Sequence, residues 1–392
     1  MSRLSCLNGR SCLFTVSVAV FLLAWSHSFL EGAPPKPTYE GFVTLLYDGR
    51  TTNELQFVGG GAPEQTESSL LVTDVQPQQE AWFVPEVAVG DFDLWVEVAA
   101  EETEYGSAGS AYSFSLTDDS GRMVQTWGIP AVNGTREKPT LIHISRRGDE
   151  VSFRDAPVKG AWSQPIRGRA SKRWCRARLK FDPGWGQKLH VLKITLGEPG
   201  VKSLFNQADL SGWEGYPGSA TESWSVNEGL LNCNGVGKTW LRSAQQYGDF
   251  NLRFDYRLKA GGNSGLFIRV PADGNHHREN ATLPPAGLEI QLLDDADEQY
   301  RTLKDYQYSA SVYDIVGASP RVSRPAGTWN SFQIDAKADR LQVWHNGQKV
   351  VDANEEKFPL LALRLRQGFL GLQNHASVIS FRNLRIGPPL GN

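Results

Sequence analysis

The chain has 392 residues, which favours two domains, and its 40% hydrophobic and 21% charged residues are typical of globular folds rather than disordered chains. Its formal net charge of −3 argues against a nucleic-acid-binding protein, which usually carries a basic field. With 2 Met but 12 Trp, 39 Gly and 21 Pro, the composition predicts an all-β protein and excludes a helical bundle, a collagenous chain and a polytopic membrane protein.

The amino terminus has the features of a targeting segment. Arg3 and Arg10 precede the apolar run Leu13–Trp25, which is shorter than the about 20 residues that a membrane span needs. We expect a signal peptide over residues 1–28, with a single membrane anchor as the alternative, and a proline-rich spacer over 29–38. The mature protein is then expected to be secreted, periplasmic or on the cell surface, with no stable membrane insertion.

Two segments of the first half recur in the second half. Leu45–Asp48 and Gly90–Leu94 each match a segment 158 positions further on. The cluster Gly197–Gly200 lies between the two copies and has the Gly/Pro composition of a linker. We therefore predict a tandem duplication, with domains over 39–197 and 198–389.

Alternation of apolar and polar residues dominates both halves, as in Phe92–Val98 and Phe250–Tyr256. This period of two is that of a β-strand with one buried face. Further strands are expected at Gly265–Val270, Leu288–Leu293, Ser331–Ala336, Leu341–His345, Gly368–Gln373 and Val378–Ile386. Many short strands with Gly-rich turns predict an all-β architecture of two tandem β-sandwiches.

Four cysteines are present, of which Cys6 and Cys12 fall in the predicted signal peptide. Cys175 and Cys233 remain, one in each half, and no Cys-x-x-Cys pattern occurs. Two buried thiols are the favoured interpretation, and a disulfide between the domains is the alternative.

The second half places polar side chains at alternating strand positions. A mixture of carboxylate, amide, cationic and aromatic groups suits a sugar, because amides and carboxylates bond hydroxyls while aromatic faces stack on C–H surfaces. A merely solvated outer face is the alternative, and we expect His276 and His277 to be solvated rather than ligands. The residues expected to bind an oligosaccharide are Asn263, Ser264, Gln291, Gln373, Trp329 and Tyr313.

A set of segments spans the second half: Leu204–Asn206, Leu210–Trp213, Gly248–Phe250, Gly262–Gly265, Glu289–Asp294, Ala326–Asn330, Gly371–His375 and Phe381–Asn383. With these segments, the second half as a whole resembles the 3-keto-disaccharide hydrolase family, also described as 3-keto-glucoside lyase/hydratase domains. Departures are small, such as Ala376 where the family usually has Gly. The resemblance implies a concanavalin A-like (jelly-roll) sandwich that acts on glycosides oxidised at C3, by removal of the C2 proton followed by elimination and hydration.

In this chemistry a base, an acid and a group that stabilises the enolate are required. Glu289, Asp294 and His375 are expected to share acid–base or metal duties, and Arg269 to stabilise the enolate oxygen. No cofactor is certain, and a divalent metal held by His375 and Glu289 stays open.

Two other functions stay open for the second half. One is a carbohydrate-binding module without turnover. The other is a conventional retaining glucanase, because Glu289, Gln291 and Asp294 reproduce the spacing of the Glu-x-Asp-x-x-Glu motif. A glucanase needs two carboxylates about 5–5.5 Å apart, and an amide replaces the middle acid here.

The first half lacks these polar motifs. It has Gly109–Ala111 where the second half has Asn263–Gly265, and neither a Glu-x-Gln-x-x-Asp nor a Gln-x-His segment follows. We expect a degenerate sandwich with an accessory or binding role.

Overall fold

The computed structural model describes residues 39–59, 63–73, 81–101, 110–118, 122–132, 134–157, 160–171, 176–183, 188–276, 282 and 284–390. The predicted signal peptide, the proline-rich spacer and Cys175 lie outside these residues. Within the described part, no helix has the length and apolar character needed to cross a membrane. Its helical segments are short 3₁₀ turns: η2 (Ala220–Glu222), η3 (Glu298–Tyr300), η4 (Asp305–Gln307) and η5 (Pro359–Leu363).

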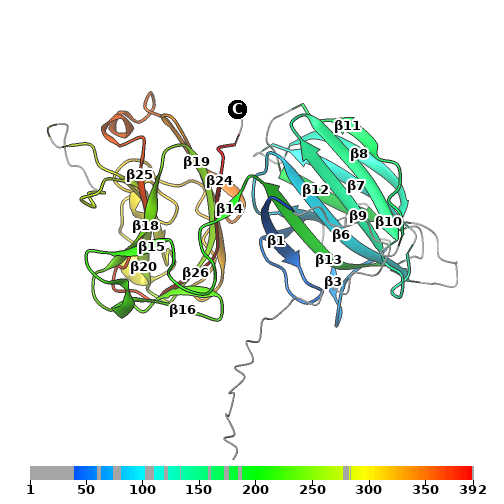
Figure 1. Ribbon diagram of the computed structural model, residues 1–392, viewed down its shortest axis with the longest axis horizontal. Coiled ribbons are helices and arrows are strands. Elements are labelled where there is room, and N and C mark those ends of the chain that lie inside the picture. Colours follow the sequence, from blue (N-terminus) through cyan, green and yellow to red (C-terminus); the bar gives the residue numbers. More distant parts are fainter. Residues whose placement is uncertain are drawn as a thin grey trace, which may run out of the picture.

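The first sandwich consists of two antiparallel sheets (Figure 1). The eight-stranded sheet contains, in order, β11 (Ile166–Arg169), β10 (Glu150–Pro157), β9 (Thr140–Arg147), β6 (Phe92–Glu101), β13 (Lys188–Pro199), β4 (Leu70–Thr73) and β3 (Glu64–Gln65), with β1 (Gly41–Tyr47) also paired to β13. The five-stranded sheet contains β2 (Leu55–Gly59), β5 (Ala81–Pro85), β12 (Arg176–Asp182), β7 (Ser110–Thr117) and β8 (Met123–Val132).

The second sandwich is built in the same way. Its eight-stranded sheet contains β16 (Trp224–Asn227), β17 (Leu230–Cys233), β26 (Ile379–Gly387), β19 (Phe250–Leu258), β22 (Asn330–Lys337), β23 (Arg340–His345) and β24 (Gln348–Ala353), with β14 (Lys202–Ser203) also paired to β26. Its five-stranded sheet contains β15 (Trp213–Tyr216), β18 (Trp240–Tyr247), β25 (Gly368–Leu372), β20 (Asn263–Val270) and β21 (Leu288–Leu293).

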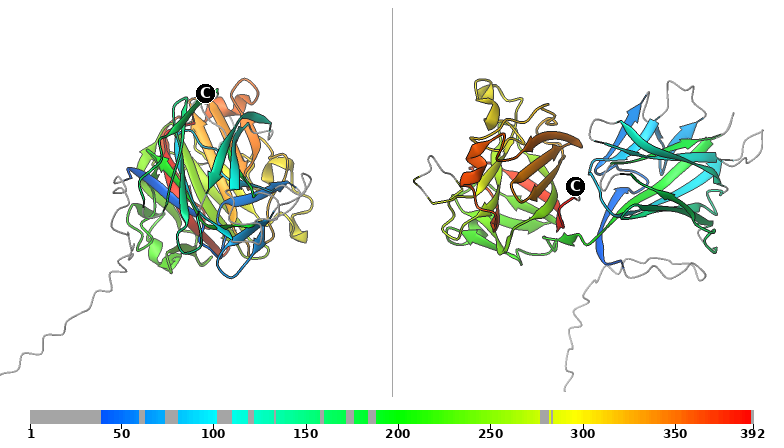
Figure 2. Two further views of the ribbon diagram at one scale, coloured as in Figure 1. Left: turned by 90° about the vertical axis from the view of Figure 1, so that its right-hand side faces the viewer. Right: turned by 90° about the horizontal axis from the view of Figure 1, so that it is seen from above.

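The two sandwiches share one strand order. The order β4-β13-β6-β9 in the first corresponds to β17-β26-β19-β22 in the second, and β5-β12-β7-β8 corresponds to β18-β25-β20-β21. Figure 2 shows the two units as separate bodies side by side. The predicted all-β class with two tandem jelly-roll sandwiches is confirmed.

Each sandwich has its own apolar core, as the alternating patterns predict. Phe92 and Leu94 lie in the core of the first sandwich, and Phe250 and Leu252 lie in that of the second. The intervening residues, such as Arg253, face outward from the eight-stranded sheet because successive side chains of a strand point to opposite faces. Cys233 is a buried free thiol.

The predicted linker Gly197–Gly200 is largely a strand. β13 continues to Pro199 through pairing with β1 and β6, and Gly200 then takes a positive φ of 74° that only glycine adopts easily. Glu198 is 1% exposed, because the second sandwich covers it. The connection between the sandwiches is therefore part of their interface.

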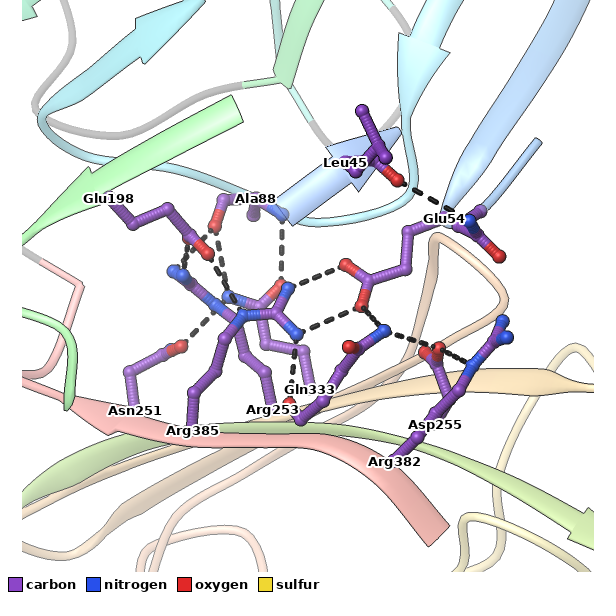
Figure 3. A network of polar contacts seen from close by, with 12 residues as sticks. Leu45, Glu54, Ala88, Glu198, Asn251, Arg253, Asp255, Gln333, Arg382 and Arg385 are labelled. Carbon is purple, nitrogen blue, oxygen red and sulfur yellow. Dashed lines mark hydrogen bonds and ion pairs between the residues drawn. The ribbon is translucent and has the colours of Figure 1, made fainter. Parts of the chain in front are cut away.

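A buried ionic network joins the two sandwiches (Figure 3). Glu54 and Glu198 of the first sandwich meet Arg385 of the second, whose Nη1 and Nε donate to them over 2.8 and 2.9 Å. Arg253 pairs with Glu198 and donates to the carbonyl oxygen of Ala88 over 3.1 Å. These arginines project from the outer face of the second sandwich's eight-stranded sheet, so that face is covered by the first sandwich.

Asp255 lies at the same interface and is 2% exposed. Its Oδ2 accepts hydrogen bonds of 2.9 Å from Arg382 and from Asn383. Burial and the neighbouring charge of Glu54 nevertheless raise the pKa of Asp255 to about 8. Burial at the interface thus works against the ionised form of this carboxyl, while the ion pair with Arg382 works for it.

A cavity of about 440 Å³ also opens between the sandwiches. Its charged lining residues include Asp91, Arg146, Asp149, Glu198 and Arg253. Glu198 and Arg253 are already paired with each other, and Asp91 accepts a hydrogen bond from the backbone of Gly148. The cavity is thus an extension of the interface.

Candidate active site

The polar residues predicted from the sequence gather on the outer face of the five-stranded sheet of the second sandwich. Leu266 and Ile268 of β20 point into the core, so Gly265 and Phe267 face outward. Phe267 pairs with Glu289 of β21, and Gly265 pairs with Gln291. In Figure 1 this sheet lies on the side of the second sandwich that faces away from the first.

Glu289 and Gln373 form the centre of this face. Gln373 Nε2 donates to Glu289 Oε1 over 2.9 Å, and the backbone N–H of Gln373 donates to Gly265 O. Gln373 Oε1 is buried and accepts no hydrogen bond from any described residue. An unsatisfied buried acceptor is costly, so this oxygen is suited to receive a donor from a ligand.

Gly265 provides the space between these two side chains. A Cβ atom at this position would lie 2.7 Å from Glu289 Oε1 and 3.1 Å from Gln373 Oε1. Only glycine lets both polar groups lie over the strand and leaves its backbone open to close approach.

The Glu289 carboxyl titrates near neutrality. Burial raises its pKa to about 7, the hydrogen bond from Gln373 acts in the opposite direction, and the charge of Asp314 raises it further. A carboxylate with a pKa close to the working pH is well matched to a general base.

A second amide pair lies on the other side of Gly265. Gln291 Nε2 donates to Asn263 Oδ1 over 2.9 Å. Among the described residues, none accepts a hydrogen bond from Asn263 Nδ2. This nitrogen is therefore available to a ligand oxygen.

Aromatic rings border the polar centre on one side. Trp240 packs edge-on against Phe267 with 5.1 Å between ring centroids, and Tyr216 packs on Trp240 at 5.2 Å. His276 stacks on Phe267 at 4.0 Å. Phe267 and Trp240 are only 1% and 7% exposed, so Tyr216 and His276, which are partly exposed, present the apolar surface of this border.

Tyr313 borders the opposite side. Its backbone N–H donates to Glu289 O, and its hydroxyl accepts from Gln307 over 2.9 Å. Tyr306 packs against it edge-on at 6.2 Å. The structure thus brings together five of the predicted residues: Asn263, Glu289, Gln291, Tyr313 and Gln373.

The structure does not place Arg269 with them. A β-bulge interrupts β20 between Phe267 and Val270, and Arg269 has a φ of 53°, so the alternation of faces fails at this point. The guanidinium donates to the carbonyl oxygens of Gly248 and Ala338 and pairs with Asp249. Arg269 therefore ties together turns at one end of the sandwich.

Ser264 and Trp329 also lie elsewhere. Ser264 is 0% exposed and donates to the backbone oxygen of Gln373, because its parity is that of the core-facing Leu266. Trp329 stacks under Arg257 and Arg382, at 4.7 and 4.2 Å from the ring centroid. Both arginines belong to the eight-stranded sheet, so Trp329 lies on the far side of the sandwich.

Asp294 and His375 lie at the ends of their strands. Asp294 Oδ2 accepts a hydrogen bond from Gly261 N over 2.9 Å and thereby fixes the turn before β20. His375 is exposed beyond the end of β25. No group of three or more His, Cys, Asp or Glu residues in the described part is placed to hold a metal ion.

Sequence reasoning missed several residues of this face. Tyr216 and Trp240 come from strands whose alternation of apolar and polar residues was not used to predict the site. His276 was expected to be solvated, but it stacks on Phe267. Asp314 follows Tyr313 directly, and this position next to a predicted site residue could have identified it as part of the site. The aromatic residues could have been found by extending the strand alternation to β15 and β18.

The first sandwich carries different residues at the corresponding positions. Strand pairing shows which positions are equivalent. In the first sandwich Leu179 is paired with Phe83 on one side and Phe114 on the other. In the second sandwich Leu372 is paired in the same way with Leu241 and Leu266. Counting outward from these pairs, the first sandwich has Lys180, Thr126 and Gly128 in the places of Gln373, Glu289 and Gln291.

Comparison with known proteins agrees with the resemblance predicted for the second half. Residues 200–387 match the family model of the 3-keto-alpha-glucoside-1,2-lyase-like domain. A 3-keto-disaccharide hydrolase of Bacteroides thetaiotaomicron is 25% identical over 237 residues, covering 51% of this chain and 82% of that protein.

Solved structures were compared as well. A candidate glycosyl hydrolase of Parabacteroides distasonis matches 48% of this chain and 94% of its own, with 26% identity and a TM-score of 0.41. The carbohydrate-binding module CBM66 of Bacillus subtilis matches 45% of this chain and 96% of its own, with 15% identity and a TM-score of 0.32.

Proposed function

We propose that the second sandwich cleaves glycosides whose glucose unit carries a ketone at C3, with Glu289 as the general base. The observation that carries this proposal is a partly buried carboxyl of pKa about 7, held by Gln373 over an open glycine on a face with an aromatic border. The family match and the hydrolase relative support the same class of substrate.

The first step is removal of the proton from C2, which the C3 carbonyl acidifies. Glu289 takes the proton, and the electron pair of the C2–H bond passes into an enolate at C3. The amide nitrogen of Asn263 is positioned on the same face to donate to the enolate oxygen. Arg269, which the sequence suggested for this role, is bound elsewhere.

The second step breaks the glycosidic bond. The enolate returns to a ketone, a C1=C2 double bond forms, and the C1–O bond breaks. The departing oxygen takes back the proton held by Glu289. Addition of water across the C1=C2 bond then gives the free 3-keto sugar, so the net reaction is hydrolysis.

A retaining glucanase would need a second carboxylate close to the first. Asp294, the only other acid in the predicted motif, is held by the turn at Gly261. The second acid of the motif is therefore engaged in a turn, whereas the carboxylate that acts on Glu289 is Asp314, which lies outside the motif.

The test is turnover of a 3-keto-glucoside beside the unoxidised glucoside, both in heavy water. Release from the oxidised substrate alone, with deuterium entering C2, is expected. Glu289→Gln should lower both signals ~10²–10⁴-fold. The matched control is Glu222→Gln, which changes an exposed acid in the turn η2. Equal release from the unoxidised glucoside without exchange contradicts the mechanism. Binding without release from either substrate favours a carbohydrate-binding module.

We also propose that the protein is exported, because of the basic start and the short apolar run of residues 1–28. Sequencing the mature amino terminus tests this, and an intact Met1 would contradict it.

A further inference from the structure

Trp329 was predicted to bind the substrate, but it lies on the side of the eight-stranded sheet, away from Glu289. Asn330 begins β22 and pairs with Tyr256, which places Trp329 beside Arg257 at the end of this strand pair. The guanidinium carbon of Arg257 lies 4.7 Å from the centre of the Trp329 ring, and that of Arg382 lies 4.2 Å from it. We call these three side chains the Arg-Trp-Arg cluster.

The backbone next to this cluster is held in place. Arg324 Nη1 donates to the carbonyl oxygen of Trp329 over 3.0 Å, and the backbone N–H of Arg324 donates to Asn330 Oδ1 over 2.8 Å. Arg324 also pairs with Glu86 of the first sandwich. The indole therefore has a fixed position at the rim of the interface between the sandwiches, where it is partly exposed.

Arg257 has no counter-ion. It forms neither a hydrogen bond nor an ion pair with any described residue. Its neighbour across the sheet on β26 is Ser380, whose hydroxyl binds Asn232 over 2.7 Å. Asp255, two positions before it on β19, is 2% exposed and accepts from Arg382 instead. The partly exposed guanidinium of Arg257 thus keeps its donors open to a ligand.

The side chains of the cluster offer donors and no acceptor. Arg382 uses its Nε for Asp255 (Figure 3), and its Nη1 and Nη2 form no hydrogen bond with a described residue. Trp329 Nε1 likewise donates to none of the residues that the structure describes. Both guanidinium groups lie less than 5 Å from one ring centre. Such a set suits an anion with several oxygens, because a guanidinium group binds phosphate-like oxygens through a planar fork.

We propose that the Arg-Trp-Arg cluster binds a sulfate or phosphate group, either as the free ion or as an ester on a saccharide. Arg257 and Arg382 would each donate to its oxygens, and the Trp329 ring would hold the two guanidinium groups in position through cation–π contacts. The negative charge of the ligand would offset the repulsion between these two like charges.

This proposal does not depend on the reaction of the second sandwich. The cluster and Glu289 belong to different sheets, and the readout is binding rather than turnover. A failure here therefore leaves the proposed function untouched.

The experiment is calorimetric titration of the full chain, at low ionic strength, with inorganic sulfate, inorganic phosphate, glucose 6-sulfate and acetate. We expect sulfate or phosphate to bind at least about tenfold more tightly than acetate, which has only two oxygens and one charge. Tighter binding of glucose 6-sulfate than of inorganic sulfate identifies an ester on a saccharide as the ligand. Equal or weaker binding identifies the free ion.

Arg257→Gln should weaken binding at least about tenfold, the typical value of a hydrogen bond to a charged group. Arg257→Lys should restore only part of the affinity, because an ammonium group keeps the charge but lacks the planar fork. The matched control is Arg321→Gln. Arg321 also lies over an aromatic ring, 3.4 Å from the centre of Tyr308, but it pairs with Asp305 over 2.8 Å. This control should bind as the wild type does.

Thermal denaturation checks that each variant is folded, and Arg257 has no hydrogen bond to lose. Four results would each overturn the proposal. They are no binding of any of the four ligands, acetate binding as tight as that of sulfate, unaltered binding by Arg257→Gln, and an equal loss in Arg321→Gln.

Discussion

Gly265 offers the sharpest test of the proposed active site. An alanine there would place a Cβ atom 2.7 Å from Glu289 Oε1, whereas an ordinary contact is about 3.4 Å. The carboxyl must therefore retreat by about 0.7 Å, or the added methyl group must displace the ligand. Since a misplacement of about 1 Å costs ~10²-fold in rate, Gly265→Ala should lower kcat/KM about 10- to 100-fold.

The net effect on the free energy of unfolding should be about 0–2.6 kcal/mol, similar in size to the about 1.4–2.7 kcal/mol that the 10- to 100-fold loss of kcat/KM represents. Overpacking costs about 1–3 kcal/mol, and the reduced entropy of the unfolded chain offsets about 0.4–1 kcal/mol of it. The assay combines initial rates on a 3-keto-glucoside with thermal denaturation. Gly248→Ala is the control, because its nearest neighbour, Arg366 O, lies 3.6 Å from the new Cβ. Wild-type kcat/KM in Gly265→Ala would show that the reacting groups do not lie over this glycine.

Three further predictions concern ionisable groups. Glu289→Gln should lower kcat by ~10²–10⁴-fold and abolish the rise in rate through about pH 7, since a base acts only when deprotonated; a pH–rate profile measures both. Glu198→Gln should cost about 3–5 kcal/mol in urea denaturation, because Arg253 and Arg385 stay buried; an unchanged midpoint contradicts this. The folded-state pKa of Asp255, about 8, exceeds its unfolded value, about 3.9, so its contribution to stability is lost as pH rises between them. Asp255→Asn should therefore lose less stability than the wild type between about pH 5 and about pH 8, and parallel curves contradict this.

The sequence predicts the site where strands alternate without interruption. From Leu288 to Leu293 the alternation is regular, so Glu289 and Gln291 share the expected face. The bulge at Arg269 breaks the alternation, and counting residues cannot detect it. Trp329 lies in a loop, and the sheet that a loop residue joins is decided by tertiary packing.

The same distinction holds for the fold. Period-two patterns predict the strands and the two separate cores, because they reflect local burial. The interface was not predicted, since Gly197–Gly200 has the composition of a linker and becomes a strand only through its pairing partners. Likewise, Arg385 looks like a solvated strand residue until Glu54 and Glu198 are placed beside it.

The two sandwiches share a strand order but meet through non-equivalent surfaces. The second sandwich is docked through Arg253. At the equivalent register position the first sandwich has Trp95, whose ring stacks on that of His143 with 5.2 Å between the centroids. Like folds that meet through unlike surfaces have no two-fold axis, so symmetry by itself would not stop such an array from growing. In this protein the side chains prevent such growth, because the first sandwich has no arginine at that position to receive another unit's carboxylates. The exchange of Arg253 for Trp95 therefore distinguishes the docked face of the second sandwich from the equivalent face of the first.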